Sequence, residues 1–197
     1  MALATFIKSA ARAADFPADT GREVAFVGRS NSGKSTALNL LAGVRKLARV
    51  SKTPGRTQLV NFFALAEDRR LVDLPGYGFA RVTGDVQQRW ERTLSRYLLE
   101  RRSLAGVVLT VDIRRGLGPL DWQLLAWLAP RSLPLMVLLT KADKLGRGAG
   151  LAGQLAVGKE LGAGARVARF SAIDRQGVEQ ARGWLDEWLR VGSSEES

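Results

Sequence analysis

Residues 28–35 read Gly-Arg-Ser-Asn-Ser-Gly-Lys-Ser and match the full pattern of a phosphate-binding loop. Glycines at positions 28 and 33 permit backbone conformations that a Cβ would resist, so successive N–H groups can turn toward a polyphosphate. Lys34 offers a cation to the β- and γ-phosphates, and the hydroxyl of Ser35 is a ligand for Mg²⁺. A glycine-rich turn that matches by chance is the competing interpretation. An apolar run before the loop and a helix-forming run after it weigh against chance, so we predict a phosphate site.

The segment Asp73-Leu74-Pro75-Gly76 follows an apolar strand and is the second candidate for phosphate chemistry. The carboxylate of Asp73 can hold Mg²⁺ through water, and the N–H of Gly76 can donate to a γ-phosphate. An Asp-Pro-Gly neighbourhood is also an ordinary turn. The motif therefore takes its meaning from its place after the phosphate loop.

Two later segments point to the base of the nucleotide. Thr140-Lys141-Ala142-Asp143 resembles the guanine-recognition motif of GTPases, in which the carboxylate accepts two hydrogen bonds from guanine and the lysine packs over the base. Adenine has no such pair of donors, so Asp143 would select GTP over ATP. A solvated Lys/Asp turn is the competing interpretation. Phe170-Ser171-Ala172 resembles the fifth GTPase motif, which places a main-chain N–H at the guanine O6.

The loop before the second motif contains Pro54-Gly55-Arg56-Thr57-Gln58. We expect the hydroxyl of Thr57 to complete the Mg²⁺ shell when a γ-phosphate is present. Thr53 is the rival residue. The hinge at Gly55 and the strand that follows favour Thr57, and alanine substitution of each threonine would separate them through Mg²⁺-dependent binding of a GTP analogue.

Together these motifs define one predicted site. Catalysis is expected to depend on Asn31, Lys34, Thr57 and Gly76. Mg²⁺ is expected to bind Ser35, Thr57 and, through water, Asp73. The residues predicted to bind GTP are Gly28, Arg29, Ser30, Asn31, Ser32, Gly33, Lys34, Ser35, Thr36, Gly55, Arg56, Thr57, Gln58, Leu59, Asp73, Leu74, Pro75, Gly76, Thr140, Lys141, Ala142, Asp143, Phe170, Ser171 and Ala172.

The composition narrows the chemistry. The chain has 197 residues with no cysteine and no histidine, which excludes thiolate nucleophiles, disulfides and the commonest general base. Catalysis must then depend on positioning, electrostatics and an oxygen-ligated cation. Phosphoryl transfer is the class of reaction that can proceed with these alone. A formal net charge of +11 indicates a polyanionic partner, with an arginine-rich solvated surface as the alternative.

No apolar run has membrane-spanning length, and charges interrupt the N-terminal segment where a signal peptide needs an apolar core. We therefore expect a cytoplasmic monomer without stable membrane association.

Strand-like and helix-like segments alternate along the chain. We expect strands over 23–27, 59–65, 70–73, 105–111, 134–139 and 166–170, and helices over 36–42, 85–102, 117–128, 145–164 and 176–190. This order predicts an α/β fold with three layers, a doubly wound sheet of six mostly parallel strands and one antiparallel strand.

Three parts are expected along the chain: residues 1–22 as an N-terminal extension with a short edge strand near 4–9, 23–191 as a GTP-binding domain, and 192–197 as a disordered tail. Glycines recur through residues 146–164, which predicts a weakly stable helix with a mobile start.

The motifs together resemble the EngB-type ribosome-biogenesis GTP-binding proteins of bacteria, which are small P-loop GTPases of the TrmE-Era-EngA-EngB-septin group with a Ras-like fold. The resemblance covers about residues 6–189, and the Pro-Gly-Arg-Thr-Gln and Pro-Gly-Tyr-Gly-Phe-Ala stretches are specific to that group. It implies a GTPase that assists assembly of the large ribosomal subunit and is needed for normal growth, division and septation. The glycine-rich stretch after Asp143 departs from the pattern of the family.

Ras-type GTPases place a water-orienting glutamine after the Asp-x-x-Gly motif, where this chain has Tyr77. A phenol cannot orient water in the same two-sided way, so intrinsic hydrolysis should be slow; simple packing of Tyr77 is the alternative. In related GTPases that lack the glutamine, an asparagine at the place of Asn31 helps to bind a monovalent cation. The resemblance therefore implies K⁺-stimulated hydrolysis as a hypothesis.

The segment around Thr57 and residues 73–80 would act as switches ordered by the γ-phosphate and Mg²⁺. Basic residues near both segments suit an encounter with ribosomal RNA: Arg45, Lys46, Arg49, Lys52, Arg56, Arg81, Arg89, Arg92 and Arg96. The rival functions are a septin-like, self-assembling structural GTPase, a GTPase of transfer RNA modification, and a P-loop kinase or ATPase.

Overall fold

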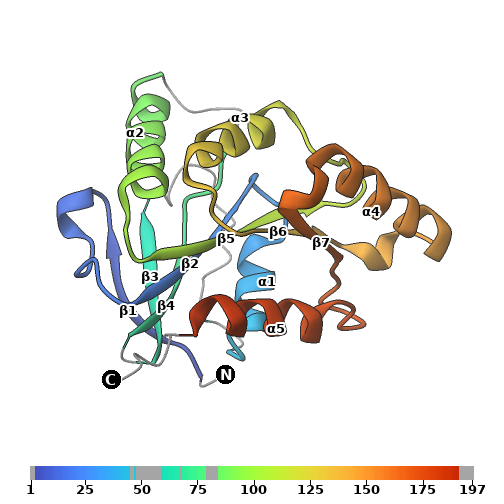
Figure 1. The fold of residues 1–197 in the computed structure, drawn as a ribbon, viewed down its shortest axis with the longest axis horizontal. Helices are drawn as coiled ribbons and strands as arrows, with labels where there is room; N and C mark the ends of the chain where they lie inside the picture. The colour runs from blue at the N-terminus through green and yellow to red at the C-terminus, as the bar shows by residue number, and fades with distance from the viewer. Residues whose placement is uncertain (1–2, 45–46, 48–58, 67, 79–83, 191–197) are drawn as a thin grey trace, which may run out of the picture.

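A single mixed sheet forms the centre of the computed structural model (Figure 1). The structure describes residues 3–44, 47, 59–66, 68–78 and 84–190, with the backbone alone for 84–90. Within these ranges the sheet has seven strands in the order β1-β3-β4-β2-β5-β6-β7. The strands are β1 (Thr5–Ala10), β2 (Arg22–Gly28), β3 (Val60–Ala66), β4 (Arg69–Asp73), β5 (Leu104–Asp112), β6 (Leu135–Thr140) and β7 (Ala165–Arg169).

The strand directions confirm the predicted α/β fold with one antiparallel strand. β3 pairs antiparallel with both of its neighbours, β1 and β4, whereas all the other pairs are parallel. The prediction of six strands was one too few. The expected edge strand of the N-terminal segment extends the same sheet, with Thr5 opposite Ala64 and Ala10 opposite Val60.

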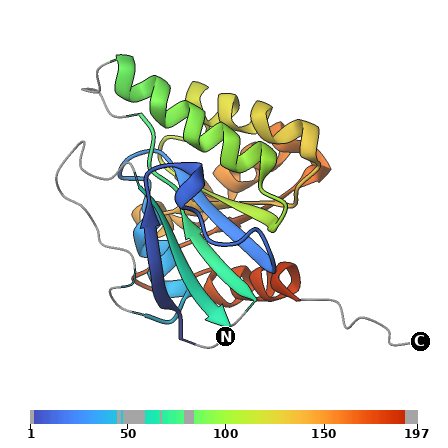
Figure 2. The ribbon, with the colours of Figure 1, turned by 90° about the vertical axis from the view of Figure 1, so that its left-hand side faces the viewer.

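Helices cover both faces of the sheet, which gives the predicted three layers (Figures 1 and 2). The helices are α1 (Lys34–Leu41), α2 (Gly84–Glu100), α3 (Pro119–Leu128), α4 (Arg147–Leu161) and α5 (Val178–Leu189). A hydrophobic core lies on each face of the sheet, and β2 contributes alternate residues to the two cores. Val24 and Phe26 pack toward α1 and α5, while Ala25 and Val27 pack toward α2, α3 and α4.

The parallel strands bring the predicted motifs to one edge of the sheet. β2 ends at Gly28, β4 at Asp73, β5 at Asp112 and β6 at Thr140. Because these strands are parallel, their carboxyl ends share an edge, which is where open α/β sheets bind ligands. The fold thereby gathers segments that are more than a hundred residues apart in sequence.

The glycine-rich stretch forms helix α4, within the range where a helix was expected. Gly158 lies in its last turns, and a Cβ built there would meet no atom within 4 Å. Gly158→Ala should therefore raise the free energy of unfolding by about 0.5–1 kcal/mol, because alanine loses less backbone entropy in a helix. Denaturant titration measures the change.

The same substitution at Gly106 in β5 is expected to have the opposite effect on stability. A Cβ at Gly106 would lie 2.4 Å from Cε3 of Trp188, so Gly106→Ala should destabilise the protein. A loss of stability in the Gly158 variant would contradict the expectation.

A buried charge cluster joins the N-terminal segment to α2. Glu23 is fully buried and pairs with Arg70 and Arg101, each at 2.7 Å. The hydroxyl of Tyr97 donates to the same carboxylate at 2.8 Å. Arg101 also donates to the carbonyl of Pro17 at 2.9 Å. The C-terminal end of α2 is thus fixed to the opposite end of the sheet from the nucleotide motifs.

Asp19 adds a pH-dependent contact to this anchor. Desolvation acts to raise its pKa, but the N–H groups of Ser103 and Arg102 and the Ser103 hydroxyl together lower the pKa of Asp19 to about 2 from 3.8. A lowered folded-state pKa stabilises the protein above pH 4, and the contribution is lost as the pH falls from about 4 to 2.

Asp19→Asn should accordingly cost about 2 kcal/mol of unfolding free energy at pH 6. The difference from the unmodified protein should shrink toward zero near pH 2, as measured by urea titration at several pH values. A difference that does not change with pH would refute this role.

Among the helices that the structure describes, none combines the length and apolar character that crossing a membrane requires. Several predicted residues lie outside the described ranges: Thr53, Gly55, Arg56, Thr57, Gln58, Phe79, Ala80 and the tail 192–197.

Candidate functional site at the carboxyl edge of the sheet

The phosphate-binding loop has the predicted strand, loop and helix arrangement. β2 ends at Gly28 and α1 begins at Lys34, directly after Gly33, whose φ is +89°. Asn31 also has a left-handed φ of 64°, an uncommon conformation for a residue with a side chain. Left-handed residues of this kind are what a phosphate-binding loop uses to form its concave turn.

A threonine on the neighbouring strand explains why residue 28 is glycine. A Cβ on Gly28 would lie 2.2 Å from Oγ1 of Thr110 in β5. The same hydroxyl contacts Oγ of Ser32 at 2.7 Å and donates to the carbonyl of Val27 at 3.1 Å. Thr140 at the end of β6 also donates to the carbonyl of Ser32. The loop is therefore supported from below by two strands.

Lys34 and Asp73 form an ion pair at the mouth of the loop. Their side chains are 11% and 8% exposed, so the two charges compensate each other in a mostly dry site. Ser35 lies next to this pair in the first turn of α1. Hydroxyl and carboxylate oxygens are ligands that suit Mg²⁺, which takes a few protein ligands and completes its shell with phosphates and water.

The chain after Asp73 runs along the phosphate loop. The N–H of Leu74 donates to the carbonyl of Phe26 at 3.0 Å. The N–H of Tyr77 then donates to the carbonyl of Gly28 at 3.3 Å, and the N–H of Ser30 donates to the carbonyl of Tyr77 at 2.7 Å. The second motif is thus hydrogen-bonded to the first.

Tyr77 is buried, with 4% of its surface exposed. Its hydroxyl donates to Oδ1 of Asp121 on α3. Burial, together with the charge of Asp121, raises the pKa of Tyr77 far above its usual value, so the hydroxyl stays a proton donor. The side chain is buried with its hydroxyl bound to Asp121 on α3, which favours the packing interpretation of this residue.

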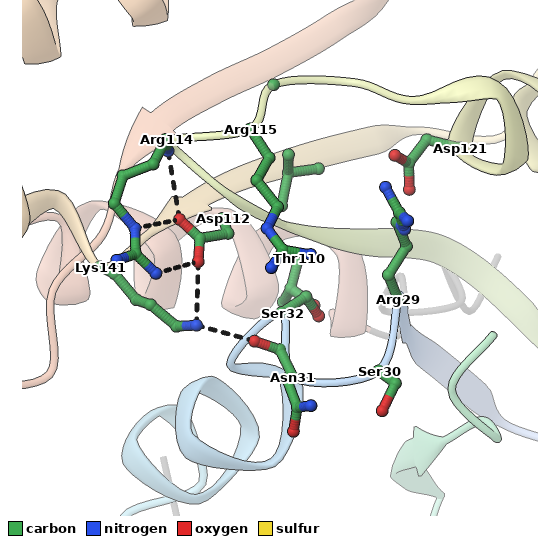
Figure 3. Close-up of a pocket in the computed structure, with 12 residues that line it drawn as sticks. Arg29, Ser30, Asn31, Ser32, Thr110, Asp112, Arg114, Arg115, Asp121 and Lys141 are labelled. Carbon is green, nitrogen blue, oxygen red and sulfur yellow. Dashed lines mark hydrogen bonds and ion pairs between the residues drawn. The ribbon is translucent and has the colours of Figure 1, made fainter. Parts of the chain in front are cut away.

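Lys141 joins the predicted guanine motif to the phosphate loop (Figure 3). Its ammonium donates to the carbonyl of Asn31 at 2.8 Å and to Oδ2 of Asp112 at 2.9 Å. Arg114 holds the same carboxylate with two guanidinium nitrogens, at 2.9 and 2.6 Å. The hydrogen bonds from Arg114 and then Lys141 hold the pKa of Asp112 well below its usual range.

Asp143 lies beside the last predicted motif. Its Oδ1 accepts a hydrogen bond from the hydroxyl of Ser171 at 3.0 Å, and Lys144 lies 3.3 Å from Oδ2. Desolvation acts to raise the pKa of Asp143, but these two contacts outweigh it and lower the pKa, so the carboxylate is ionised at neutral pH. An ionised acceptor is what the paired donors of guanine require.

Backbone hydrogen bonds fix the two base-binding segments to each other. The N–H of Ala142 donates to the carbonyl of Phe170 at 3.2 Å, and the N–H of Phe170 donates to the carbonyl of Leu139 at 2.8 Å. Phe170 is buried in the core, whereas Ala172 is exposed and accessible to a ligand.

A small pocket lies between the phosphate loop and the loop after β5 (Figure 3). Polar and charged side chains dominate its lining, which consists of Arg29, Ser30, Asn31, Ser32, Thr110, Val111, Asp112, Arg114, Arg115, Gly116, Asp121 and Lys141.

The structure brings together the predicted residues 28–36, 73–76, 140–143 and 170–172 at one edge, with Leu59 just before β3. Sequence reasoning missed Thr110, Asp112, Arg114 and Asp121. Asp112 ends a buried strand, as Asp73 does, and that position could have identified it. Thr110 and Asp121 have no comparable signal, because their partners are known only from the fold.

Comparison with known proteins assigns the family. The model of the 50S ribosome-binding GTPase family matches residues 23–141. A "probable GTP-binding protein EngB" of Nitrosococcus oceani is 53% identical over 187 residues, or 93% of this chain and 94% of that protein. This chain belongs to the EngB family of GTP-binding proteins. The protein of the same name from Escherichia coli is 49% identical over 188 residues, or 93% of this chain and 89% of that protein.

Solved structures agree on the fold of the EngB-family chain. A crystal structure of a probable GTP-binding protein engB matches with a TM-score of 0.70 at 23% identity, covering 85% of this chain and 98% of that one. Era in complex with MgGDPNP and part of 16S ribosomal RNA matches with a TM-score of 0.68 at 21% identity, covering 88% and 58%. These likenesses support the Ras-like P-loop fold. The family assignment makes this chain a GTP-binding protein of the GTPase class.

Proposed function

We propose that this chain is a slow, Mg²⁺-dependent GTPase switch that assists assembly of the large ribosomal subunit and is thereby needed for normal growth, division and septation. The proposal rests on one observation: Lys34, Asp73 and Asp143, which belong to three different motifs, lie at the same edge of the sheet. The family description, a 50S ribosome-binding GTPase, supports the choice of partner.

In this proposal GTP lies along the phosphate loop, with its base at the other two motifs. Asp143 accepts the paired donors of guanine, and Lys141, held by Asp112, packs its stem over the base. The residues assigned to GTP are 28–36, 55–59, 73–76, 140–143 and 170–172. We assign residues 23–191 as the GTP-binding domain, 1–22 as the extension and 192–197 as the tail.

Mg²⁺ would be held by Ser35 and Thr57, and through water by Asp73. When bound, the ion neutralises charge on the β- and γ-phosphates. Lys34 must leave the Asp73 carboxylate to meet those phosphates. Nucleotide binding then replaces the ammonium of Lys34 with Mg²⁺ as the charge partner of Asp73.

Hydrolysis should be slow because no described side chain takes the place of the water-orienting glutamine. Asn31 would support turnover as a ligand of K⁺, while Lys34 and the N–H of Gly76 stabilise charge on the γ-phosphate. Turnover in KCl should exceed turnover in NaCl at equal ionic strength, and Asn31→Ala should abolish the difference. Equal turnover in the two salts would reject K⁺ stimulation.

Exposed arginines on α2 and just beyond it suit RNA as the partner, with Arg96 also paired to Glu100 at 2.8 Å. Arg92 and Arg96 are exposed on the helix that follows the second switch, and Arg102 is 86% exposed just beyond its end. Contacts to RNA phosphates should weaken steeply with salt. The proposed protein is cytoplasmic and monomeric, without stable membrane association.

Sedimentation with purified ribosomal subunits tests this proposal. The protein with a non-hydrolysable GTP analogue should comigrate with the large subunit, and the protein with GDP should stay mostly at the top of the gradient. Comigration that is the same with the analogue, GDP or no nucleotide would reject a switch. Nucleotide-dependent oligomers without ribosomes would instead favour a self-assembling GTPase.

A further inference from the structure

We infer that Asp121 is a positioning residue for the GTPase reaction: acting through Tyr77, it holds Gly76 against the phosphate loop, where the Gly76 N–H meets the γ-phosphate. The inference deepens the proposed function and rests on the role assigned there to Gly76.

The carboxylate of Asp121 accepts two hydrogen bonds, one at each oxygen. Oδ1 of Asp121 accepts the hydrogen bond from the hydroxyl of Tyr77, and Oδ2 accepts one from the N–H of Gly118 at 2.8 Å. Asp121 is 1% exposed in the first turn of α3. The helix itself packs into the core through Leu124 and Leu128. The hydroxyl of Tyr77 is therefore bound to a helix that is fixed in the core.

The backbone of Tyr77 carries this constraint to the phosphate loop. It exchanges hydrogen bonds with Gly28 and Ser30, at 3.3 and 2.7 Å. Gly76 lies so close that a Cβ there would be 3.5 Å from the carbonyl of Gly28. Within the part of the chain described, the N–H of Gly76 makes no hydrogen bond, so it is available to a ligand.

Arg29, the second residue of the phosphate loop, fills the space around this contact. A Cβ on Gly78 would lie 3.4 Å from Nε of Arg29, and a Cβ on Gly118 would lie 3.1 Å from its Nη1. Figure 3 shows the Arg29 guanidinium and the Asp121 carboxylate facing each other. The phosphate loop, the switch and the start of α3 therefore meet at one point.

The geometry predicts an effect on GTP that GDP does not share. A donor that is already fixed binds its acceptor without further loss of conformational entropy. Without the Tyr77 hydroxyl, Gly76 must be ordered when the γ-phosphate arrives. GDP has no γ-phosphate, so its affinity should not depend on this contact.

Tyr77→Phe tests the inference, and the chain offers a matched control. Tyr97 is the other tyrosine; it is 1% exposed, and its hydroxyl also donates to a buried carboxylate, that of Glu23. Affinities for GDP and for a non-hydrolysable GTP analogue are measured for each variant with Mg²⁺. Tyr77→Phe should weaken the analogue about tenfold relative to GDP, because only the analogue must order Gly76 when it binds. Tyr97→Phe should lower the melting temperature and leave the ratio unchanged.

Asp121→Ala provides the second test and carries the experiment alone if the Tyr77 variant does not fold. It should reduce the ratio by a similar factor, and combining both changes should cause no further loss. An unchanged ratio in folded Tyr77 or Asp121 variants would overturn the inference. A gain in affinity for the analogue would also overturn it, because the hydrogen bond between Tyr77 and Asp121 would then hold the protein in a state that binds GTP less well.

Gly76→Pro removes the N–H itself and so separates this inference from the proposed function on which it depends. If that variant loses the analogue selectively while Tyr77→Phe does not, only the positioning role of Asp121 fails. If Gly76→Pro also leaves the ratio unchanged, the γ-phosphate role of Gly76 itself fails.

Discussion

Asp143→Asn is expected to weaken binding of GTP and GDP by at least about 100-fold and to admit xanthine nucleotides. The Asp143 carboxylate is ionised and held by Ser171 at 3.0 Å, which presents it as an acceptor for two guanine donors. Two hydrogen bonds to a charged group contribute about 3 kcal/mol together, which corresponds to about 100-fold in affinity. An asparagine amide instead keeps one acceptor oxygen and has an NH₂ group in place of the other, and this NH₂ group complements the additional carbonyl of xanthine.

Fluorescence titration with labelled GDP, competed by GTP, ATP and XTP, measures this change. Asp68→Asn is the matched control, because Asp68 lies just before β4, at the opposite end of that strand from Asp73. The control should bind GTP as the unmodified protein does. Guanine affinity that survives in the Asp143 variant would show that the base is recognised elsewhere.

Lys34→Ala should abolish measurable binding of both GDP and GTP, again by at least about 100-fold. Lys34 is the cation at the mouth of the loop, and its charge-assisted bonds to two phosphates would be lost together. The substitution also leaves Asp73, which is 6% exposed, without its ion-pair partner, so the free energy of unfolding should fall by about 3 kcal/mol as well.

Isothermal titration of each nucleotide, with thermal unfolding in parallel, separates these two effects. Lys159→Ala on the exposed face of α4 is the control and should leave both unchanged. A Lys34 variant that keeps GDP affinity within a few-fold would contradict the assignment of the phosphate loop.

The two predictions differ in which nucleotides they affect. Asp143 governs the choice of base, so its variant should exchange one nucleotide for another. Lys34 governs the phosphates, so its variant should lose every nucleotide. The two results together would show which part of the site binds the base and which part binds the phosphates.

The sequence was sufficient for the parts of the fold that depend on local patterns. Strands read as continuous apolar runs, such as β5 and β6, appear within a residue or two of the expected positions. The phosphate loop was predictable for the same reason, since its glycines and its lysine fall at fixed spacings. An edge strand near residues 4–9 was also expected, but its place in the main sheet was not, because that place depends on the pairing of β1 with β3 rather than on the composition of β1.

The supporting residues of the site could not be predicted in the same way. Gly28 was expected to provide conformational freedom, yet its closest constraint is the side chain of Thr110, on a strand whose neighbours depend on the sheet order. Lys141 was expected over the base, and its restraint by Asp112 required the distance between β5 and β6. Contacts between side chains on different strands become visible only once the strands are ordered.

The structure assigns Tyr77 a contact that the sequence did not predict. In the sequence, Tyr77 was notable only because it stands where Ras-type GTPases have a water-orienting glutamine. In the fold it is the link between the switch and α3, through a carboxylate that no motif includes. The slow hydrolysis we propose and the positioning role of Asp121 thus concern the same residue.

In the proposed function, GTP and the large ribosomal subunit favour the same state of this protein. Linkage then requires the subunit to raise the affinity for GTP by the same factor by which GTP raises the affinity for the subunit. Titration of a non-hydrolysable GTP analogue and of GDP, with and without saturating large subunit, measures this factor. We expect the subunit to raise the affinity for the analogue about tenfold or more and to change the affinity for GDP little. Equal effects on both nucleotides, or none on either, would contradict it.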